Sequence, residues 1–278
     1  MATEFNRVAL SVNAHPDDAE AWNAGVLKLL HDRGYKIVIA TMTGGDLGGC
    51  NMSMEETARL RFGEAKAAAA VLDAEYYTMG GIDGSLFDSP EIRLKLISLM
   101  RKVRAGIVFT HLPNDYHPDH RATAAIVEAA AMVASLDPVP VPEKPLEVTP
   151  LLYHTSPLTL SDPLGSQLTP PHFFVDVTSA VQTKIEMLGK HQSQLDLMKH
   201  MHKIDDFFGY VLEGEYEHAL DDEPVKQYEA GDTFYEPSGS VHRVARNPSA
   251  KTRTRLLAVI LHARDAKGSE YDFVYVLK

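Results

Sequence analysis

Up to about residue 200, short apolar runs alternate with longer segments whose apolar residues recur every three or four positions. Short apolar runs are typical of buried strands, and the longer spacing is typical of amphipathic helices. In the first helical segment, Trp22, Val26 and Leu29 fall on one stripe, which suits packing against a sheet. Strands are predicted at 7–13, 35–43, 75–79 and 106–111, and helices at 20–33, 54–72, 90–104 and 119–134. This alternation predicts an α/β fold with a Rossmann-like, mostly parallel sheet and helices on both faces.

The pattern changes in the second half of the chain. Residues 137–150 contain five prolines without a regular period, which predicts a loop. Strands at 151–154 and 172–177 and a helix at 178–198 are expected to follow. Beyond about residue 208, short runs rich in β-branched and aromatic residues are broken by Gly and Pro, which indicates an all-β module. We therefore predict two domains, residues 1–205 and residues 206–278.

Two polar motifs couple a histidine through proline to aspartate: AHPDDAE at 14–20 and HPDH at 117–120. Taken singly, each motif is explained by helix capping, since Asp17 and Asp119 both precede predicted helices. The motifs follow the first and the fourth strand, however, and these strands are neighbours in a sheet of order 3-2-1-4. Capping does not require histidine, and it gives no reason for both motifs to lie at one crevice. We therefore expect one joint site.

The residue types of this joint site indicate metal chemistry. Two histidines and one carboxylate, with a position left for water, form a catalytic zinc shell, and the same set suits Fe²⁺. A further acid and a further histidine stand beside these ligands in the sequence, which favours hydrolysis. The site must be built from His and carboxylates, because Cys50 is the only cysteine in 278 residues.

Composition narrows the classes of partner. The formal net charge of −11 argues against nucleic acid or an acidic membrane surface. No segment approaches the roughly 20 apolar residues of a membrane span, and the N-terminus lacks the pattern of a signal peptide. We expect a cytoplasmic protein that acts on a small molecule.

With these motifs, the chain resembles the LmbE/PIG-L family of zinc-dependent N-acetylglucosaminyl deacetylases over about residues 5–200. The further matching features are TGGDLGG at 43–49, Arg61-x-x-Glu64, Asp83-Gly84 and His191-x-Ser193-Gln194. The resemblance implies that His15, Asp18 and His120 bind the metal and that Asp17 is the general base. It also implies that His117 is a cationic group facing the oxyanion, oriented by Asp119.

The same resemblance matches Arg61 and Asp83 to substrate-binding positions. An exposed i,i+3 ion pair between Arg61 and Glu64 is the alternative. Gly44 and Gly45 are expected to let their loop pass close to the metal, or else to form a flexible turn. His191 and Gln194 lie near the site or make ordinary polar contacts on a helix.

Residues 209–262 resemble a second family, the cupins. GYVLEGE at 209–215 is similar to the end of the first cupin motif, and the second motif is matched by Gly231, Pro237, Gly239 and His242. Phe207 stands where the first motif has an acid, and His200-x-His202 fits its spacing imperfectly. We therefore favour a packing module over a metal site here. Because the barrel is incomplete, its strand edges predict a homo-oligomer.

The resemblance implies removal of an acetyl group from an N-acetylated amino sugar or sugar conjugate. An amidase for a larger acyl group is the first alternative. The other two are a cupin-type metal-dependent isomerase or dioxygenase, and a binding protein without catalysis. A binding protein has little need of Asp17, which favours an enzyme.

Overall fold

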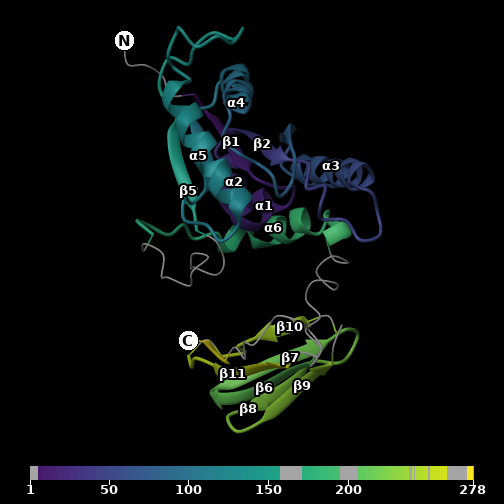
Figure 1. Ribbon diagram of the computed structural model, residues 1–278. Helices are drawn as coiled ribbons and strands as arrows, with labels where there is room; N and C mark the ends of the chain where they lie inside the picture. The colour runs from purple at the N-terminus through teal and green to yellow at the C-terminus, as the bar shows by residue number, and fades with distance from the viewer. Residues whose placement is uncertain are drawn as a thin grey trace. The chain divides into compact units, whose positions relative to one another are not determined.

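A computed structural model of the chain describes residues 6–156, 171–194, 206–237, 240, 242–249, 251–261 and 274–277. The chain divides into two compact units, Met1–Leu197 and Met198–Lys278 (Figure 1). The assignment of domains to residues 1–205 and 206–278 stays a prediction.

The first unit is built on a five-stranded parallel sheet of order β3-β2-β1-β4-β5. In β1, Ala9 pairs with Ile37 of β2 on one side and with Ile107 of β4 on the other. The predicted order 3-2-1-4 and the Rossmann-like class are therefore confirmed. The strands are β1 (Val8–Asn13), β2 (Lys36–Thr43), β3 (Glu75–Gly81), β4 (Ile107–His111) and β5 (Leu151–Thr155).

Helices cover both faces of this sheet. Successive residues of a strand point to opposite sides, so neighbouring residues of β1 pack against different helices. Leu10 belongs to a core with Met100 of α4 and Ile126 of α5. Its neighbour Ala9 belongs to a second core with Leu27 of α2. The helices are α1 (Asp18–Trp22), α2 (Ala24–His31), α3 (Met54–Ala70), α4 (Pro90–Val103), α5 (Pro118–Val133) and α6 (Val181–Leu188), with the short 3-10 turn η1 (Thr178–Ala180) before α6.

The predicted helix 20–33 is divided into α1 and α2 at Asn23. The buried Asn23 amide donates to Ser11 Oγ at 2.7 Å and to Asn13 Oδ1 at 3.1 Å, so this position is tied to β1. A period of apolar residues does not reveal such a polar tie.

The predicted strand at 172–177 is wrong. These residues are irregular and mostly exposed, so their β-branched and aromatic side chains do not join the sheet. The predicted helix 178–198 begins as η1, and α6 ends at Leu188. Residues 195–198 lie outside the described part of the chain.

The second unit is all-β, as predicted. One sheet has the order β10-β7-β8 and the other the order β12-β11-β6-β9. Val211, Tyr216, Phe234 and Leu256 form a small buried core. The strands are β6 (Asp206–Glu213), β7 (Glu215–Leu220), β8 (Lys226–Glu229), β9 (Thr233–Pro237), β10 (His242–Arg246), β11 (Arg255–Leu261) and β12 (Val274–Leu277). The homo-oligomer expected from these strand edges stays a prediction.

Among the helices that the structure describes, none combines the length and the apolar character needed to cross a membrane.

Leu27→Ala is expected to lower the free energy of unfolding by about 2–5 kcal/mol, because it leaves a cavity in the core between α2 and the sheet. Leu27 is fully buried, whereas Leu60 on α3 is 42% exposed and provides the control. Leu60→Ala is expected to cost less than about 1 kcal/mol. Urea denaturation of both variants measures the difference, and equal losses would contradict this core assignment.

Candidate metal centre

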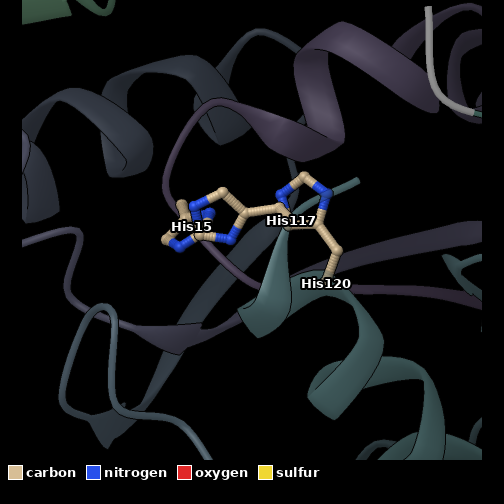
Figure 2. A group of neighbouring side chains, drawn as sticks. All are labelled: His15, His117 and His120. Atoms are coloured by element: carbon tan, nitrogen blue, oxygen red, sulfur yellow. The ribbon is translucent and has the colours of Figure 1, made fainter. Parts of the chain in front are cut away.

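Both His/Asp motifs lie at the carboxyl edge of the parallel sheet. AHPDD continues β1, and HPDH follows β4 after a short loop and begins α5. Since β1 and β4 are hydrogen-bonded neighbours, their ends bring the two motifs together. Figure 2 shows the side chains of His15, His117 and His120 close together at this edge, with their rings tilted or edge-on to one another.

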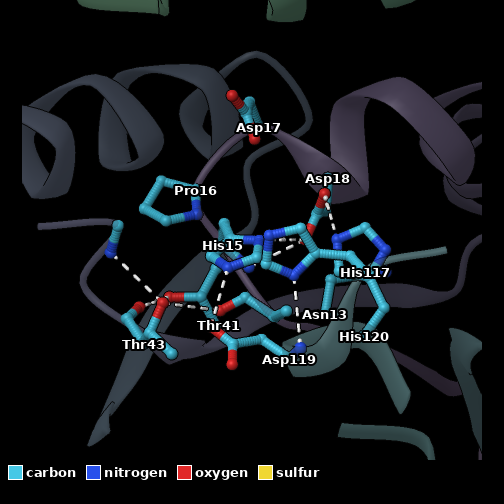
Figure 3. Close-up of polar contacts among 12 residues, drawn as sticks. Asn13, His15, Pro16, Asp17, Asp18, Thr41, Thr43, His117, Asp119 and His120 are labelled. Atoms are coloured by element: carbon cyan, nitrogen blue, oxygen red, sulfur yellow. Dashed lines mark hydrogen bonds and ion pairs between the residues drawn. The ribbon is translucent and has the colours of Figure 1, made fainter. Parts of the chain in front are cut away.

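The carboxylate of Asp18 lies between imidazoles from both motifs. Its Oδ2 is 3.3 Å from His15 Nδ1, and its Oδ1 is 3.4 Å from His120 Nε2. The backbone N–H of His15 also donates to Asp18 Oδ2 at 2.8 Å (Figure 3). All three side chains are buried. The structure therefore brings together the three residues that the resemblance implies as ligands.

Two residues that the sequence analysis missed complete this group. Asp115 Oδ1 lies 2.8 Å from His120 Nδ1, and His111 stacks on His120 with 3.8 Å between ring centroids. His111 Nε2 is also 3.3 Å from Asp18 Oδ2. A signal was present for both residues, since His111 ends a buried strand and Asp115 lies two positions before HPDH.

The hydrogen bonds of the imidazoles decide which nitrogens are open to a metal. Asp115 Oδ1 accepts a hydrogen bond from His120 Nδ1, and Asp119 and Asp83 face His15 Nε2 at 3.2 Å and 3.1 Å. These bonds leave His120 Nε2 and His15 Nδ1 as the nitrogens that face Asp18, and each could bind a metal once it has lost its proton. His111 Nε2, in contrast, already accepts from the backbone N–H of Ala14 at 2.9 Å. His15, Asp18 and His120 stay the predicted ligands, and among the described residues the donor groups close enough to hold a metal include Asp18, His111 and His120 as well as His15, His117 and His120.

The electrostatics of the centre also favour bound positive charge. Although burial acts against it, the carboxylates of Asp18 and Asp115 raise the pKa of His120 to about 9. Burial likewise opposes a charged Asp119, but the bond to His15 and backbone N–H donors lower its pKa to about 2. The carboxylates of the cluster therefore carry negative charge that neutral imidazoles would leave uncompensated.

Asp119 and His117 differ from what the resemblance implies. The Asp119 carboxylate accepts from Gly84 N at 2.6 Å and Leu86 N at 3.3 Å, and it contacts His15 instead of His117. His117 Nδ1 accepts from the backbone N–H of Asp119 at 3.2 Å, and the pKa of His117 is lowered by burial and by the nearby His15. His117 is therefore oriented by the backbone, and its surroundings disfavour the expected cation.

Asp17 lies at the start of α1 but does not cap it, since its side chain makes no capping hydrogen bond. Its backbone has φ 101° in the left-handed region, which is unusual for a residue other than glycine. Arg61 Nη2 donates to Asp17 Oδ2 at 3.1 Å. Burial raises the pKa of Asp17 to about 6, although Arg61 acts in the opposite direction.

Arg61 is 4% exposed, so it does not form the exposed ion pair with Glu64, and its substrate-binding role stays a prediction. Besides Asp17, its guanidinium donates to Gly45 O at 2.9 Å and to Pro16 O. It forms no ion pair with Glu64, whose carboxylate bonds Ser193. Asp83 accepts from Leu47 N at 3.1 Å and faces His15, so it supports the metal centre.

The glycine loop after β2 packs against Arg61. A Cβ at Gly45 would lie 2.3 Å from Arg61 Nη1, and a Cβ at Gly48 would lie at the same distance. At Gly44 a Cβ would approach Ala58 at 3.3 Å. The glycines at 45 and 48 therefore make room for the guanidinium, and the expectation that the loop approaches the metal stays a prediction.

His191 and Gln194 contact residues other than the imidazoles of this cluster. His191 Nε2 is 3.5 Å from Glu20 Oε2, and Gln194 Nε2 donates to Gly48 O at 3.1 Å. His200, His202 and Gly239 lie outside the described residues. For His242 the backbone belongs to β10 but the side chain is not described.

Comparisons with known proteins show which families and structures the chain resembles. Residues 10–131 match the family of GlcNAc-PI de-N-acetylases, PIG-L, and residues 190–260 match the cupin domain. A diacetylchitobiose deacetylase of Thermococcus kodakarensis is 28% identical over 204 residues, which are 68% of this chain and 72% of the relative.

Two solved structures have a similar fold. An N,N'-diacetylchitobiose deacetylase from Pyrococcus horikoshii is 24% identical with a TM-score of 0.60, covering 70% of this chain and 74% of that one. GalB, the 4-carboxy-2-hydroxymuconate hydratase from Pseudomonas putida KT2440, is 22% identical with a TM-score of 0.60, covering 71% and 84%. At these identities the likeness shows the fold alone.

The family match and the curated relative identify the protein as an enzyme of the deacetylase class, a hydrolase of carbon–nitrogen bonds other than peptide bonds. More particularly, it carries a PIG-L (LmbE) domain followed by a cupin domain, which confirms both resemblances.

Gly48→Ala is expected to lower the free energy of unfolding by about 1–3 kcal/mol, because the added methyl group displaces the buried guanidinium of Arg61. Gly63→Ala on α3 is the control, since a Cβ there meets no atom within 4 Å. It is expected to raise the same free energy by about 0.5–1 kcal/mol. Chemical denaturation measures both, and stabilisation by Gly48→Ala would refute the close packing of loop and arginine.

Proposed function

We propose that the protein is a zinc-dependent hydrolase that removes the acetyl group from an N-acetylated amino sugar or sugar conjugate. The observation that carries this proposal is the buried carboxylate of Asp18 between His15 and His120, with a second carboxylate at Asp17. The family match supports amide cleavage, and the curated relative supports an acetylated sugar as substrate.

His15 Nδ1, Asp18 and His120 Nε2 would hold the metal, for which zinc is proposed and Fe²⁺ is the alternative. A bound zinc ion supplies an acidified water and polarises a carbonyl group. Asp115 and Asp119 fix the two imidazoles, because each carboxylate accepts from the ring nitrogen that faces away from Asp18.

Asp17 is proposed to act as the general base. Its carboxylate is half-buried, and its backbone adopts the left-handed conformation directly before Asp18. It would accept a proton from the attacking water and return that proton to the nitrogen of the leaving amine. Arg61 positions Asp17 through their 3.1 Å contact.

His117 is proposed to stabilise the oxyanion that forms when water attacks the amide carbonyl. Its Nδ1 accepts from the backbone, so the remaining proton of the neutral ring lies on Nε2. A neutral N–H donor of this kind can stabilise the developing negative charge. The ring then does not need the positive charge that the family resemblance implies for His117.

An assay of acetate and free amine tests the proposal. Diacetylchitobiose and a series of N-acetylglucosamine conjugates are incubated with zinc-loaded and with chelated protein. Release of both products by the zinc-loaded protein alone is expected. Release only from conjugates with longer N-acyl groups would instead identify an amidase. If none of these amides is cleaved with zinc or with Fe²⁺, the deacetylase proposal is wrong.

His120→Ala is expected to abolish stoichiometric zinc binding, because it removes one of three protein ligands. His172→Ala serves as the control, since His172 is exposed and lies in the irregular segment 171–177. Elemental analysis after dialysis gives the metal content of both variants. Unchanged zinc in His120→Ala would overturn the ligand assignment.

Asp17→Asn is expected to retain zinc but to reduce kcat by about 10²–10⁴-fold, as for the loss of a general base. The amide keeps the size of the carboxylate and an oxygen that can accept from Arg61, so the fold of the loop is preserved. Steady-state kinetics with parallel elemental analysis measures both quantities. Full activity in this variant would exclude the proton-transfer role.

A further inference from the structure

The segment 191–194 contacts three elements that are distant from it in the sequence. Ser193 donates from its backbone N–H to Glu64 Oε1 at 2.7 Å and from its hydroxyl to Glu64 Oε2 at 2.6 Å. Gln194 donates to Gly48 O of the glycine loop at 3.1 Å. His191 is 3% exposed and lies 3.5 Å from Glu20 of α1. The segment therefore joins α1, α3 and the glycine loop.

These elements are the ones that hold Asp17. The helix α1 follows Asp17 directly, and α3 carries Arg61, which bonds the Asp17 carboxylate. The glycine loop is held twice, since Arg61 donates to Gly45 O and Gln194 donates to Gly48 O.

The contact between Ser193 and Glu64 has a particular consequence for Arg61. Glu64 lies three residues after Arg61 on α3, a spacing at which opposite charges on a helix attract one another. In the structure, however, both oxygens of Glu64 accept from Ser193. Two charge-assisted hydrogen bonds of this length are strong enough to compete with an i,i+3 ion pair. Glu64 is thereby kept from Arg61, and among the contacts given for the described residues Asp17 is the one carboxylate that Arg61 bonds.

We propose that Ser193 is a positioning residue that sequesters Glu64, so that Arg61 stays paired with Asp17, and that Gln194 assists by fixing the glycine loop. Without Ser193, the carboxylate of Glu64 is released and draws the Arg61 guanidinium away from Asp17. This inference rests on the proposed role of Asp17 as the general base.

Kinetics of Ser193→Ala and of a second-site variant test the inference. Ser193→Ala is expected to lower kcat about 10- to 100-fold, the scale of a misplaced catalytic group, with KM and zinc content unchanged. Adding Glu64→Gln is expected to restore most of kcat, because a neutral amide no longer attracts Arg61. A purely structural role for Ser193 predicts no rescue, so the absence of rescue would overturn the inference.

Gln192→Ala is the matched control, because Gln192 lies in the same segment but is exposed and bonds only Gly189 O among the contacts described for it. It is expected to leave kcat unchanged. A fall in kcat equal to that of Ser193→Ala would show that any change in this segment disturbs the enzyme and would refute the specific role.

A crystal structure of metal-free Ser193→Ala gives a readout that does not depend on activity. The Arg61 guanidinium is expected to bond Glu64 and to leave Asp17, and an unchanged Arg61–Asp17 pair would refute the inference. If the guanidinium moves but Asp17→Asn is fully active, the positioning contact stands and the proposed role of Asp17 fails. The two failures are therefore distinguishable.

Discussion

The centre depends on the Asp18 carboxylate, which lies between an imidazole from each of the two motifs. It is buried, so the cost of removing its charge from water must be offset by the groups around it. His15 and His120 provide this compensation from the ends of two adjacent strands. The parallel sheet brings these residues together, because the neighbouring strands β1 and β4 end at the same edge. The carboxylates of Asp115 and Asp119 bond the other ring nitrogens of these two imidazoles and so orient them.

A second buried interaction, between Arg61 and Asp17, organises the surroundings of the centre. Arg61 occupies space that side chains at Gly45 and Gly48 would fill, so the glycine loop is shaped around a guanidinium. The left-handed backbone at Asp17 is maintained in this setting, where Pro16 O and Asp17 Oδ2 both accept from Arg61. Strain of this kind persists only when neighbouring contacts determine it, and it is common at catalytic sites.

Some elements of the fold follow from the local sequence pattern, and others depend on contacts between distant residues. The strands of the first unit and their order follow from apolar periodicity and the alternation of elements. The break at Asn23 and the irregular segment 172–177 do not, because they depend on a buried amide and on the absence of a partner strand. The motif residues were predicted to meet from the strand order, and their separate roles were implied by the family resemblance. The contributions of His111 and Asp115 could not be separated from ordinary polar positions, since their importance lies in contacts with His120.

By itself the sequence determined the α/β class, the two-part organisation, and the meeting of His15, Asp18 and His120 at one edge of the sheet. These features depend on local periodicity and on chain order, which a single sequence contains. The tertiary structure decided which side chain each carboxylate bonds: Asp119 bonds His15, Asp17 bonds Arg61, and Glu64 bonds Ser193. Such pairings are set by side-chain packing between residues up to 129 positions apart, and no spacing in the sequence encodes them.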